Sequence, residues 1–345
     1  VQCRNTQGNE TCTIKTKHVV STVGPWTDLL GKKIIADWKN ILKPSKGIHL
    51  TLPRHKLPLN EAVVMADDEH QRIVFGIPRK DMVIVGTTDT PYSGDPADVT
   101  ASSEDVRYLM GVVNHYFPEA HLQAADYLAS YAGIRPLVRT DEATVGKTSR
   151  EHTVFSYPSG MTFVAGGKYT TYRRMSQQIV DHVLNFFSGH EQLKFQPSQT
   201  KSVLNASCSP DELMRSRICL EEWSRQFLAP LAKVEMLWER HGADTYAMLE
   251  GNRAVAFDRE YDVWCMEAKK AIQDTMCMNL VDFYLRRTPL FLSEPDQGIR
   301  FIEPISRVFA ENLNWSQDEL RRQLAAVQAK RQSELAWRTN LRGLA

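Results

Sequence analysis

Long apolar runs and an excess of one charge are both missing from this sequence, and each absence excludes a class of protein. No run of about 18 apolar residues occurs, so no segment is predicted to span a membrane. Lysine and arginine number 42 against 41 aspartates and glutamates. The resulting net charge of +1 argues against a nucleic-acid-binding protein that relies on a basic surface, so any cationic site must be local.

Cysteine is also sparse, and its arrangement argues against a metal site. The six cysteines contain no Cys-x-x-Cys pair and no adjacent histidine pattern. Their scattered placement is typical of reduced thiols in a cytoplasm. No signal peptide is visible within these residues. The cysteines are Cys3, Cys12, Cys208, Cys219, Cys265 and Cys277.

The most informative segment that is present runs from Gly166 to Ser176, Gly-Gly-Lys-Tyr-Thr-Thr-Tyr-Arg-Arg-Met-Ser. Two glycines let the backbone come close to a ligand, and the following helix offers unpaired N–H groups and the positive end of its dipole. Apolar residues at Met175, Ile179 and Val183 have helical spacing. The segment predicts an anion site, and an ordinary strand-to-helix turn with a solvated lysine is the alternative.

Short apolar runs between Lys46 and Gly86 predict an antiparallel sheet. The expected strands are Ile48–Leu52, Ala62–Met65, Arg72–Ile77 and Met82–Val85. A helix is expected from Ser103 to Phe117, because Pro118 stops it. Other expected strands are Tyr131–Leu137, His152–Tyr157 and Met161–Ala165, with an opening hairpin of Val1–Cys3 and Thr11–Val20.

After a polar linker from Gln192 to Ser202, the pattern is helical to the end of the chain. The segments Ser209-Pro210-Asp211-Glu212 and Ser316-Gln317-Asp318-Glu319 are capping boxes that predict helix starts. One long helix is expected over Glu267–Leu285. Residues 200–345 are therefore expected to form a separate helical domain.

Four further segments precede the glycine turn in the chain: Val19–Trp26, Gly86–Asp89, Ala132–Leu137 and Ser149–His152. Together with Gly166–Lys168 they closely resemble the FAD-dependent glycerol-3-phosphate dehydrogenases. The resemblance continues in Trp238–Gly242 and Leu285–Pro289, so it spans nearly the whole chain. The expected fold class is α+β in three parts. They are a partial FAD-binding α/β domain (1–45 and 146–190), an antiparallel-sheet substrate domain (46–145) and an all-α C-terminal domain (200–345).

One motif that the resemblance implies is missing. Members of that family open with a strand, a Gly-x-Gly-x-x-Gly turn and a helix whose N-terminus holds the FAD pyrophosphate. No such motif occurs here, the chain has no initiator methionine, and it begins within an expected hairpin. We therefore expect a fragment that lacks the first part of the cofactor domain and is inactive alone.

The resemblance also implies site residues. Arg135 and Arg150 are expected to bind the substrate phosphate, since a guanidinium binds phosphate oxygens bidentately, although a single arginine is usually a solvated surface group. Lys168 is expected near both substrate and flavin, where its charge stabilises the reduced ring. The other expected cofactor contacts are Gly24, Pro25, Trp26, Gly166, Gly167, Thr170 and Thr171. Helix capping by the two threonines and a core role for Trp26 stay open as alternatives.

Two departures from the family pattern concern the packing around the flavin. Ser21-Thr22 stand where asparagine and alanine are usual, and Arg79 stands where a tryptophan is common. The catalytic base is not assigned. His49 matches a sheet position and is expected to be structural, while His152 is expected near the pocket.

The implied function is the oxidation of sn-glycerol 3-phosphate to dihydroxyacetone phosphate in glycerol metabolism, with electrons passing from FAD to a quinone. A glycerol-3-phosphate oxidase that uses oxygen is the nearest alternative. A non-catalytic module that binds a phosphate ligand or a partner, without FAD, is the second. A cytoplasmic location is expected, and peripheral association with the inner face of the cell membrane and a homodimer are compatible with it.

Overall fold

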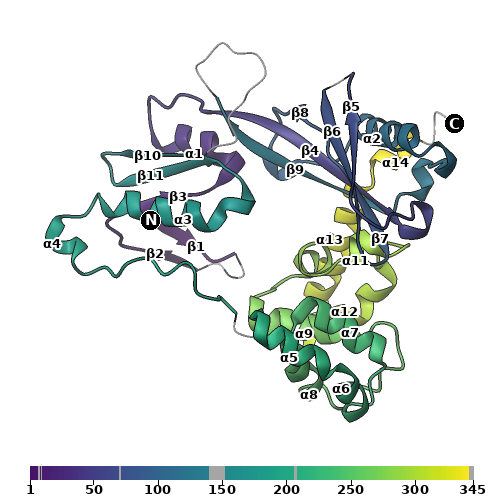
Figure 1. Cartoon of the computed structure of the whole chain (residues 1–345). Helices are drawn as coiled ribbons and strands as arrows, with labels where there is room; N and C mark the ends of the chain where they lie inside the picture. Colours follow the sequence, from purple (N-terminus) through teal and green to yellow (C-terminus); the bar gives the residue numbers. More distant parts are fainter. Residues whose placement is uncertain (7, 9, 70, 140–151, 206–207, 342–345) are drawn as a thin grey trace. The chain divides into compact units, whose positions relative to one another are not determined.

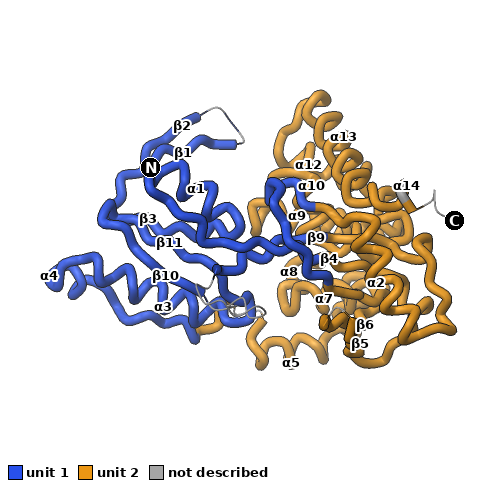
Figure 2. Tube along the Cα trace, turned by 90° about the horizontal axis from the view of Figure 1, so that it is seen from above, with its two compact units in different colours: residues 1–47, 88–99, 132–201 blue, residues 48–87, 100–131, 202–345 orange. Residues whose placement is uncertain are grey.

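The computed structural model describes residues 1–6, 8, 10–69, 71–139, 152–205 and 208–341 (Figure 1). The chain divides into two compact units, coloured in Figure 2. Unit 1 contains Val1–Gly47, Thr88–Val99 and Ala132–Lys201, and unit 2 contains Ile48–Thr87, Thr100–Tyr131 and Ser202–Ala345. The antiparallel sheet strands of unit 2 and the C-terminal helices thus share a unit, and the three-part division expected from the sequence stays a prediction.

Unit 1 is built on a three-stranded sheet with the order β10 (His152–Tyr157), β11 (Met161–Gly166) and β3 (Val19–Ser21). β11 runs antiparallel to β10 and parallel to β3. Side chains alternate between the faces, so Phe155 and Phe163 share one face while Ser156 and Thr162 share the other. The α-helices described in this unit are α1 (Thr27–Ile34), α3 (Tyr172–Leu184) and the short α4 (Gly189–Gln192).

The two faces of this sheet are covered by different elements. Trp38, which follows α1, packs its indole against the Phe163 ring at a centroid distance of 4.7 Å. Asp28 of α1 holds that segment by accepting hydrogen bonds from Trp38 Nε1 (3.0 Å) and from two backbone N–H groups beyond it. On the opposite face Ser156 Oγ lies 2.9 Å from His182 Nε2 of α3. The layers helix, sheet, helix are those of an α/β domain.

The expected N-terminal hairpin is confirmed only in part. β1 (Gln2–Arg4) pairs antiparallel with β2 (Thr11–Thr13). The expectation that one strand runs from Thr11 to Val20 is wrong, because the chain leaves the hairpin after Thr13 and β3 joins the other sheet. Thr16 Oγ1 donates to the carbonyl of His18 at 2.8 Å in the intervening turn. A pattern of alternating residues does not reveal a change of sheet within such a run.

The antiparallel strands expected after Lys46 are confirmed. The sheet has the order β5-β6-β7-β4-β8, and β9 also pairs with β4. Its inner face is apolar and packs under α2 (Ser103–Tyr116), whose Val106, Leu109 and Val113 are fully buried. The strands are β4 (Leu42–Pro53), β5 (Val63–Asp67), β6 (Arg72–Pro78), β7 (Met82–Gly86), β8 (Thr90–Pro91) and β9 (Ala129–Val138).

The C-terminal region is helical, as expected. Ser209 Oγ accepts from the Glu212 N–H at 3.3 Å and Ser316 Oγ from the Glu319 N–H at 3.1 Å, so both expected helix starts are confirmed. The helices before residue 276 are α5 (Pro210–Ile218), α6 (Leu220–Gln226), α7 (Leu231–His241), α8 (Asp244–Glu250) and α9 (Asp262–Thr275). Those after it are α10 (Leu280–Asp282), α11 (Leu290–Ser293), α12 (Ile302–Leu313), α13 (Gln317–Glu334) and α14 (Trp337–Leu341).

The single helix expected over Glu267–Leu285 is wrong. α9 ends at Thr275, and Met276 has a left-handed backbone with φ of 51°. Asn279 then starts α10, because its side chain accepts from the Asp282 N–H at 2.8 Å, and a π-helical turn follows over Phe283–Arg287. Asparagine side chains compete with the backbone for hydrogen bonds and favour helix starts over helix interiors.

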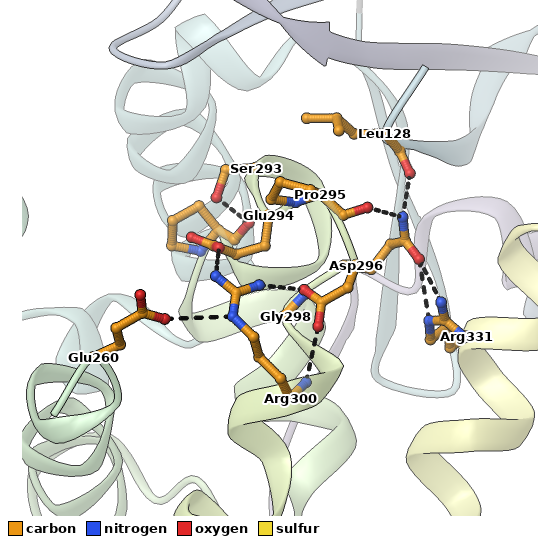
Figure 3. A network of polar contacts seen from close by, with 11 residues as sticks. Leu128, Glu260, Ser293, Glu294, Pro295, Asp296, Gly298, Arg300 and Arg331 are labelled. Atoms are coloured by element: carbon orange, nitrogen blue, oxygen red, sulfur yellow. Dashed lines mark hydrogen bonds and ion pairs between the residues drawn. The ribbon is translucent and has the colours of Figure 1, made fainter. Parts of the chain in front are cut away.

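A polar network ties the helices of unit 2 to the residues before β9 (Figure 3). The buried Gln297 donates to the Leu128 carbonyl at 2.9 Å and accepts from Arg331 of α13 at 2.7 Å. Arg300 forms ion pairs with Glu294 at 2.7 Å and Asp296 at 2.5 Å. The segment from Glu294 to Arg300 is therefore fixed by hydrogen bonds of Gln297 to Leu128 and Arg331 and by the ion pairs of Arg300. Across the described ranges, no helix is both long and apolar enough to cross a bilayer.

Candidate functional site

Arg135 of β9 lies beside two other segments of the chain, Thr88–Asp89 and strand β4. Its Nη1 donates to the Thr88 carbonyl at 3.0 Å and lies 3.5 Å from Asp89 Oδ1. Asp89 also accepts a short hydrogen bond from the hydroxyl of Ser45 on β4. The expected Gly86–Asp89 and Ala132–Leu137 segments are thus brought together, with Arg135 held by a carboxylate and a carbonyl.

Gly47 makes room for this arginine. A Cβ at Gly47 would lie 2.3 Å from Arg135 Nη2 and 2.5 Å from Nη1, closer than any real contact. The guanidinium therefore crosses directly over the β4 backbone, and its side chain keeps 30% of its surface exposed. An arginine that is oriented by Asp89 and still reaches solvent can bind an anion bidentately.

The glycine turn has the geometry that its sequence predicts. Gly166 ends β11 with φ of 74°, and Gly167 follows with φ of 98°, values that favour glycine. A Cβ at Gly167 would lie 2.3 Å from Met175 Cε and 3.3 Å from His152 Cβ. His152 is also the register partner of Gly166, so the end of the Ser149–His152 segment lies beside the turn.

Lys168 and the two threonines follow this turn on the surface. Lys168 is exposed, and its ammonium has no ion-pair partner in the part of the chain that the structure describes. Thr171 occupies the N-cap position of α3, but its side chain makes no capping hydrogen bond to the first N–H groups of the helix. Thr171 Oγ1 instead donates to the Lys168 carbonyl at 3.0 Å, and α3 begins one residue later.

The Gly24-Pro25-Trp26 segment lies at the same edge of the sheet as the glycine turn. It follows β3, and β3 is the parallel neighbour of β11, so both chain segments leave the carboxyl ends of adjacent parallel strands. Ligands of open α/β sheets bind at this edge. Gly24 has φ of 56°, and Trp26 is 41% exposed among the described residues, so it is not part of their buried core.

Three further residues singled out in the sequence, Arg150, His49 and Arg79, lie in unit 2 or outside the described residues. Arg150 lies outside the described residues. His49, in unit 2, stacks on Tyr131 with ring centroids 4.8 Å apart and an angle of 10°, above Gly86, which has no side chain to obstruct it. Arg79, also in unit 2, lines a cavity of about 680 Å³ together with Arg54 and Trp264.

Sequence reasoning missed two features of the site. It singled out Asp89 only as part of a segment, whereas the structure makes Asp89 the partner of Arg135 and Ser45. It noted Ser21 only as a departure, whereas the Ser21 hydroxyl is buried and has no hydrogen-bond partner among the described residues. A short polar residue at the end of an apolar strand was the available signal for Ser21. In the described ranges, no cluster of three or more histidines, cysteines or carboxylates could hold a metal ion.

Comparison with known proteins places the chain in a family. A family model described as FAD dependent oxidoreductase matches residues 1–173, just over half of the chain, and the chain belongs to this family. A second model, described as the C-terminal domain of alpha-glycerophosphate oxidase, matches residues 214–320. The family resemblance and the α+β fold class expected from the sequence are thereby confirmed.

Individual relatives have one activity in common. An aerobic glycerol-3-phosphate dehydrogenase of Staphylococcus saprophyticus is 27% identical over 328 residues, which cover 92% of this chain and 58% of the relative. A protein of the same name from Staphylococcus aureus (strain USA300) is 36% identical over 195 residues, which cover 56% of this chain and 35% of the relative. The chain thus spans less than two thirds of the length of these curated relatives.

A solved structure is similar over nearly the whole chain. The glycerol-3-phosphate dehydrogenase from Bacillus halodurans, complexed with FAD, has a TM-score of 0.82 and 27% sequence identity. The similarity covers 97% of this chain and 66% of that one.

Proposed function

We propose that this chain is part of an enzyme that oxidises sn-glycerol 3-phosphate to dihydroxyacetone phosphate with FAD and passes the electrons to a quinone. The observation that carries the proposal is the order of the two family models along one chain, an FAD-dependent oxidoreductase followed by an alpha-glycerophosphate oxidase C-terminal domain. The similarity over 97% of the chain to an FAD-bound glycerol-3-phosphate dehydrogenase supports it.

The residues at the carboxyl edge of the unit 1 sheet fit a bound flavin. Gly166 and Gly167 carry no side chains and have positive φ angles, so the turn itself offers only backbone to a flat ring, with Met175 packed where a Cβ of Gly167 would lie. The hydroxyl of Ser21, buried and without a hydrogen-bond partner in the described residues, lies at the end of the neighbouring strand. Gly24, Pro25, Trp26, Thr170 and Thr171 would complete the cofactor contacts.

The chain's own cations would act on substrate and cofactor. Arg135, oriented by Asp89 and Thr88, would bind the substrate phosphate together with Arg150. Lys168 would place its positive charge beside the pyrimidine edge of the ring or beside the substrate. When bound, FAD accepts the hydride that leaves C2 of the substrate.

Reduction of the natural protein that carries this chain tests the proposal. Anaerobic addition of glycerol 3-phosphate is expected to bleach the yellow flavin absorbance, and a quinone analogue is expected to restore it. Glycerol, which lacks the phosphate, is the matched control and should bleach it far less. Persistent colour with glycerol 3-phosphate would contradict the proposal.

The name of the C-terminal family model favours one alternative, an oxidase. In that case oxygen, rather than the quinone analogue, restores the colour rapidly and forms hydrogen peroxide. The residues Val1–Ala345 expressed alone are expected to be colourless, because the glycine-rich pyrophosphate turn is not among them. The expected cytoplasmic location, peripheral membrane association and homodimer belong to the same proposal.

The role of Arg150 can be tested in the same natural protein. Arg150→Ala is expected to weaken the interaction with substrate by about 1.5–3 kcal/mol, seen mainly in kcat/KM, because it removes a charge-assisted hydrogen bond. Arg150→Lys should restore only part of the loss, since lysine lacks the planar fork. Unchanged kinetics in the alanine variant would remove Arg150 from the site.

A further inference from the structure

Two of the six cysteines face each other across the N-terminal hairpin. Cys3 of β1 and Cys12 of β2 are direct partners in the antiparallel register, and both are free thiols. Side chains of directly opposed residues leave the same face of a hairpin, with Cβ atoms roughly 4.5–5.5 Å apart. A disulfide requires roughly 3.5–4.5 Å between these atoms. A small movement of the two strands therefore brings the sulfur atoms within bonding distance.

The backbone hydrogen bonds of the hairpin show whether Cys3 and Cys12 form a hydrogen-bonded or a non-hydrogen-bonded pair. Val1 and Ile14 exchange both backbone hydrogen bonds, at 2.9 and 2.8 Å, and the Asn5 N–H donates to the Glu10 carbonyl at 2.8 Å. Hydrogen-bonded and non-hydrogen-bonded pairs alternate along an antiparallel ladder. Cys3 and Cys12, two residues from each of these pairs, are therefore a hydrogen-bonded pair, which holds side chains further apart. A disulfide formed there is strained and easily reduced.

We propose that Cys3 and Cys12 form a reversible thiol–disulfide exchange site that reacts with low-molecular-weight disulfides. The exposed Cys12 thiolate attacks one sulfur of the external disulfide, forms a mixed disulfide and releases one thiolate. The less exposed Cys3 thiolate then attacks the Cys12 sulfur and releases the second thiolate. The two cysteines lose two electrons and two protons, and the external disulfide is reduced to two thiols.

The redox state of Cys3 and Cys12 controls how well ordered the hairpin is. β1 and β2 form a separate two-stranded sheet of three residue pairs, and such a hairpin is marginally stable on its own. A bond between Cys3 and Cys12 closes a short ring and restricts the unfolded hairpin. The oxidised hairpin is consequently the more ordered one.

The test is peptide mass mapping of the chain after equilibration in glutathione buffers of graded oxidised fraction. The expected result is a bond between Cys3 and Cys12, with a mass lower by two hydrogens, which reduction with dithiothreitol reverses. Cys208, which is also exposed but belongs to none of the strand pairs among the described residues, is the internal control and should carry glutathione instead. Glutathione on both Cys3 and Cys12 without a bond between them would overturn the proposal.

Two variants separate the steps. Cys3→Ser should accumulate glutathione on Cys12, because the resolving thiol is gone. Cys12→Ser should leave Cys3 to react more slowly than Cys12 does in the first variant. Hydrogen exchange of the unsubstituted chain checks the hairpin directly, since oxidation should slow exchange at the Asn5 and Ile14 amides. Equal rates at both cysteines, or exchange that oxidation leaves unchanged, would count against the site.

Discussion

Trp337 donates its indole N–H to the hydroxyl of Ser130 at 2.9 Å, although 207 residues separate them in the sequence. Both residues are buried, and the Ser130 hydroxyl in turn donates to the Glu334 carbonyl at 2.9 Å. Arg338 of α14 donates to the carbonyls of Tyr127 and Leu128 at 2.6 and 2.8 Å. The last two helices therefore hold Ser130 of β9 through two buried hydrogen bonds, and α14 holds the two residues before β9 through part-buried ones.

Replacing Ser130 by alanine should destabilise unit 2. The change leaves the Trp337 N–H and the Glu334 carbonyl buried without this partner, and each such loss costs about 1–3 kcal/mol. A lower urea midpoint of unfolding is expected, and Ser333→Ala, on the exposed surface of α13, is the matched control. In a double-mutant cycle with Trp337→Phe the two losses should be less than additive. Additive losses would mean that the bond contributes nothing.

Gly47→Ala should displace the Arg135 side chain although the substitution lies on β4, outside the Ala132–Leu137 segment that contains Arg135. The added methyl would lie 2.3 Å from Nη2, so the guanidinium must leave the Thr88 carbonyl and Asp89. If Arg135 binds the substrate phosphate, KM should rise by roughly tenfold or more, the equivalent of about 1.5–3 kcal/mol for a charged hydrogen bond. Gly133→Ala, whose new methyl has no atom of the described residues within 4 Å, is the control. An unchanged KM would exclude Arg135 from phosphate binding.

Gly167→Ala should affect the cofactor turn. Alanine is strained at φ of 98°, which costs about 1–3 kcal/mol, and its methyl displaces Met175. The expected result in the natural protein is a lower thermal midpoint and weaker FAD retention during gel filtration. Gly189→Ala, in open space on α4, should leave both unchanged. Full flavin occupancy in Gly167→Ala would argue that the ring does not approach this turn.

Lys168→Met distinguishes between two locations for the same charge. If the ammonium lies at the flavin, its loss lowers the reduction potential by about 20–45 mV, the equivalent of one to two kcal/mol in a two-electron couple. If it lies at the substrate phosphate, KM rises and the potential hardly moves. Redox titration of the free enzyme beside steady-state kinetics separates these outcomes, with the exposed Lys194→Met as control. An unshifted potential would refute the flavin role.

His18 should make stability depend on pH. Burial, and then the charge of His182, lowers the pKa of His18 below its ordinary value of 6.5. Its Nε2 lies 2.7 Å from Thr162 Oγ1, and its Nδ1 is buried without a partner in the described residues. Below pH 6.5 the unfolded chain takes up a proton before the folded chain does. The free energy of unfolding should therefore fall on acidification from this pH, by up to about 1.4 kcal/mol per pH unit.

Urea unfolding between about pH 7.5 and 5 measures how the free energy of unfolding changes with pH. This range brackets about 6.5, the ordinary pKa of histidine. His18→Gln should reduce this dependence on pH, whereas the substitution His190→Gln at an exposed position should not. Identical slopes in all three proteins would show that His18 titrates alike in the folded and unfolded states.

Local patterns were sufficient for the elements whose signals are short-range. The helix starts at Ser209 and Ser316 can be predicted from the sequence because each capping hydrogen bond joins residues only three positions apart. The left-handed backbone of Gly166 and Gly167 likewise follows from the lack of a Cβ. The break at Met276–Asn279 was missed because the apolar spacing continues across it, and a buried Cys277 does not interrupt a helical pattern.

By itself the sequence determined the glycine turn, the alternation of the antiparallel strands and the start of each capped helix, since bonds between near neighbours decide these features. Only the tertiary structure decided that Asp89 orients Arg135, that β3 leaves the hairpin to lie parallel to β11, and that Cys3 opposes Cys12. These relationships depend on which strands pair and in which register. The free energy of pairing is distributed over many side chains of a sheet, and no single segment of sequence carries it.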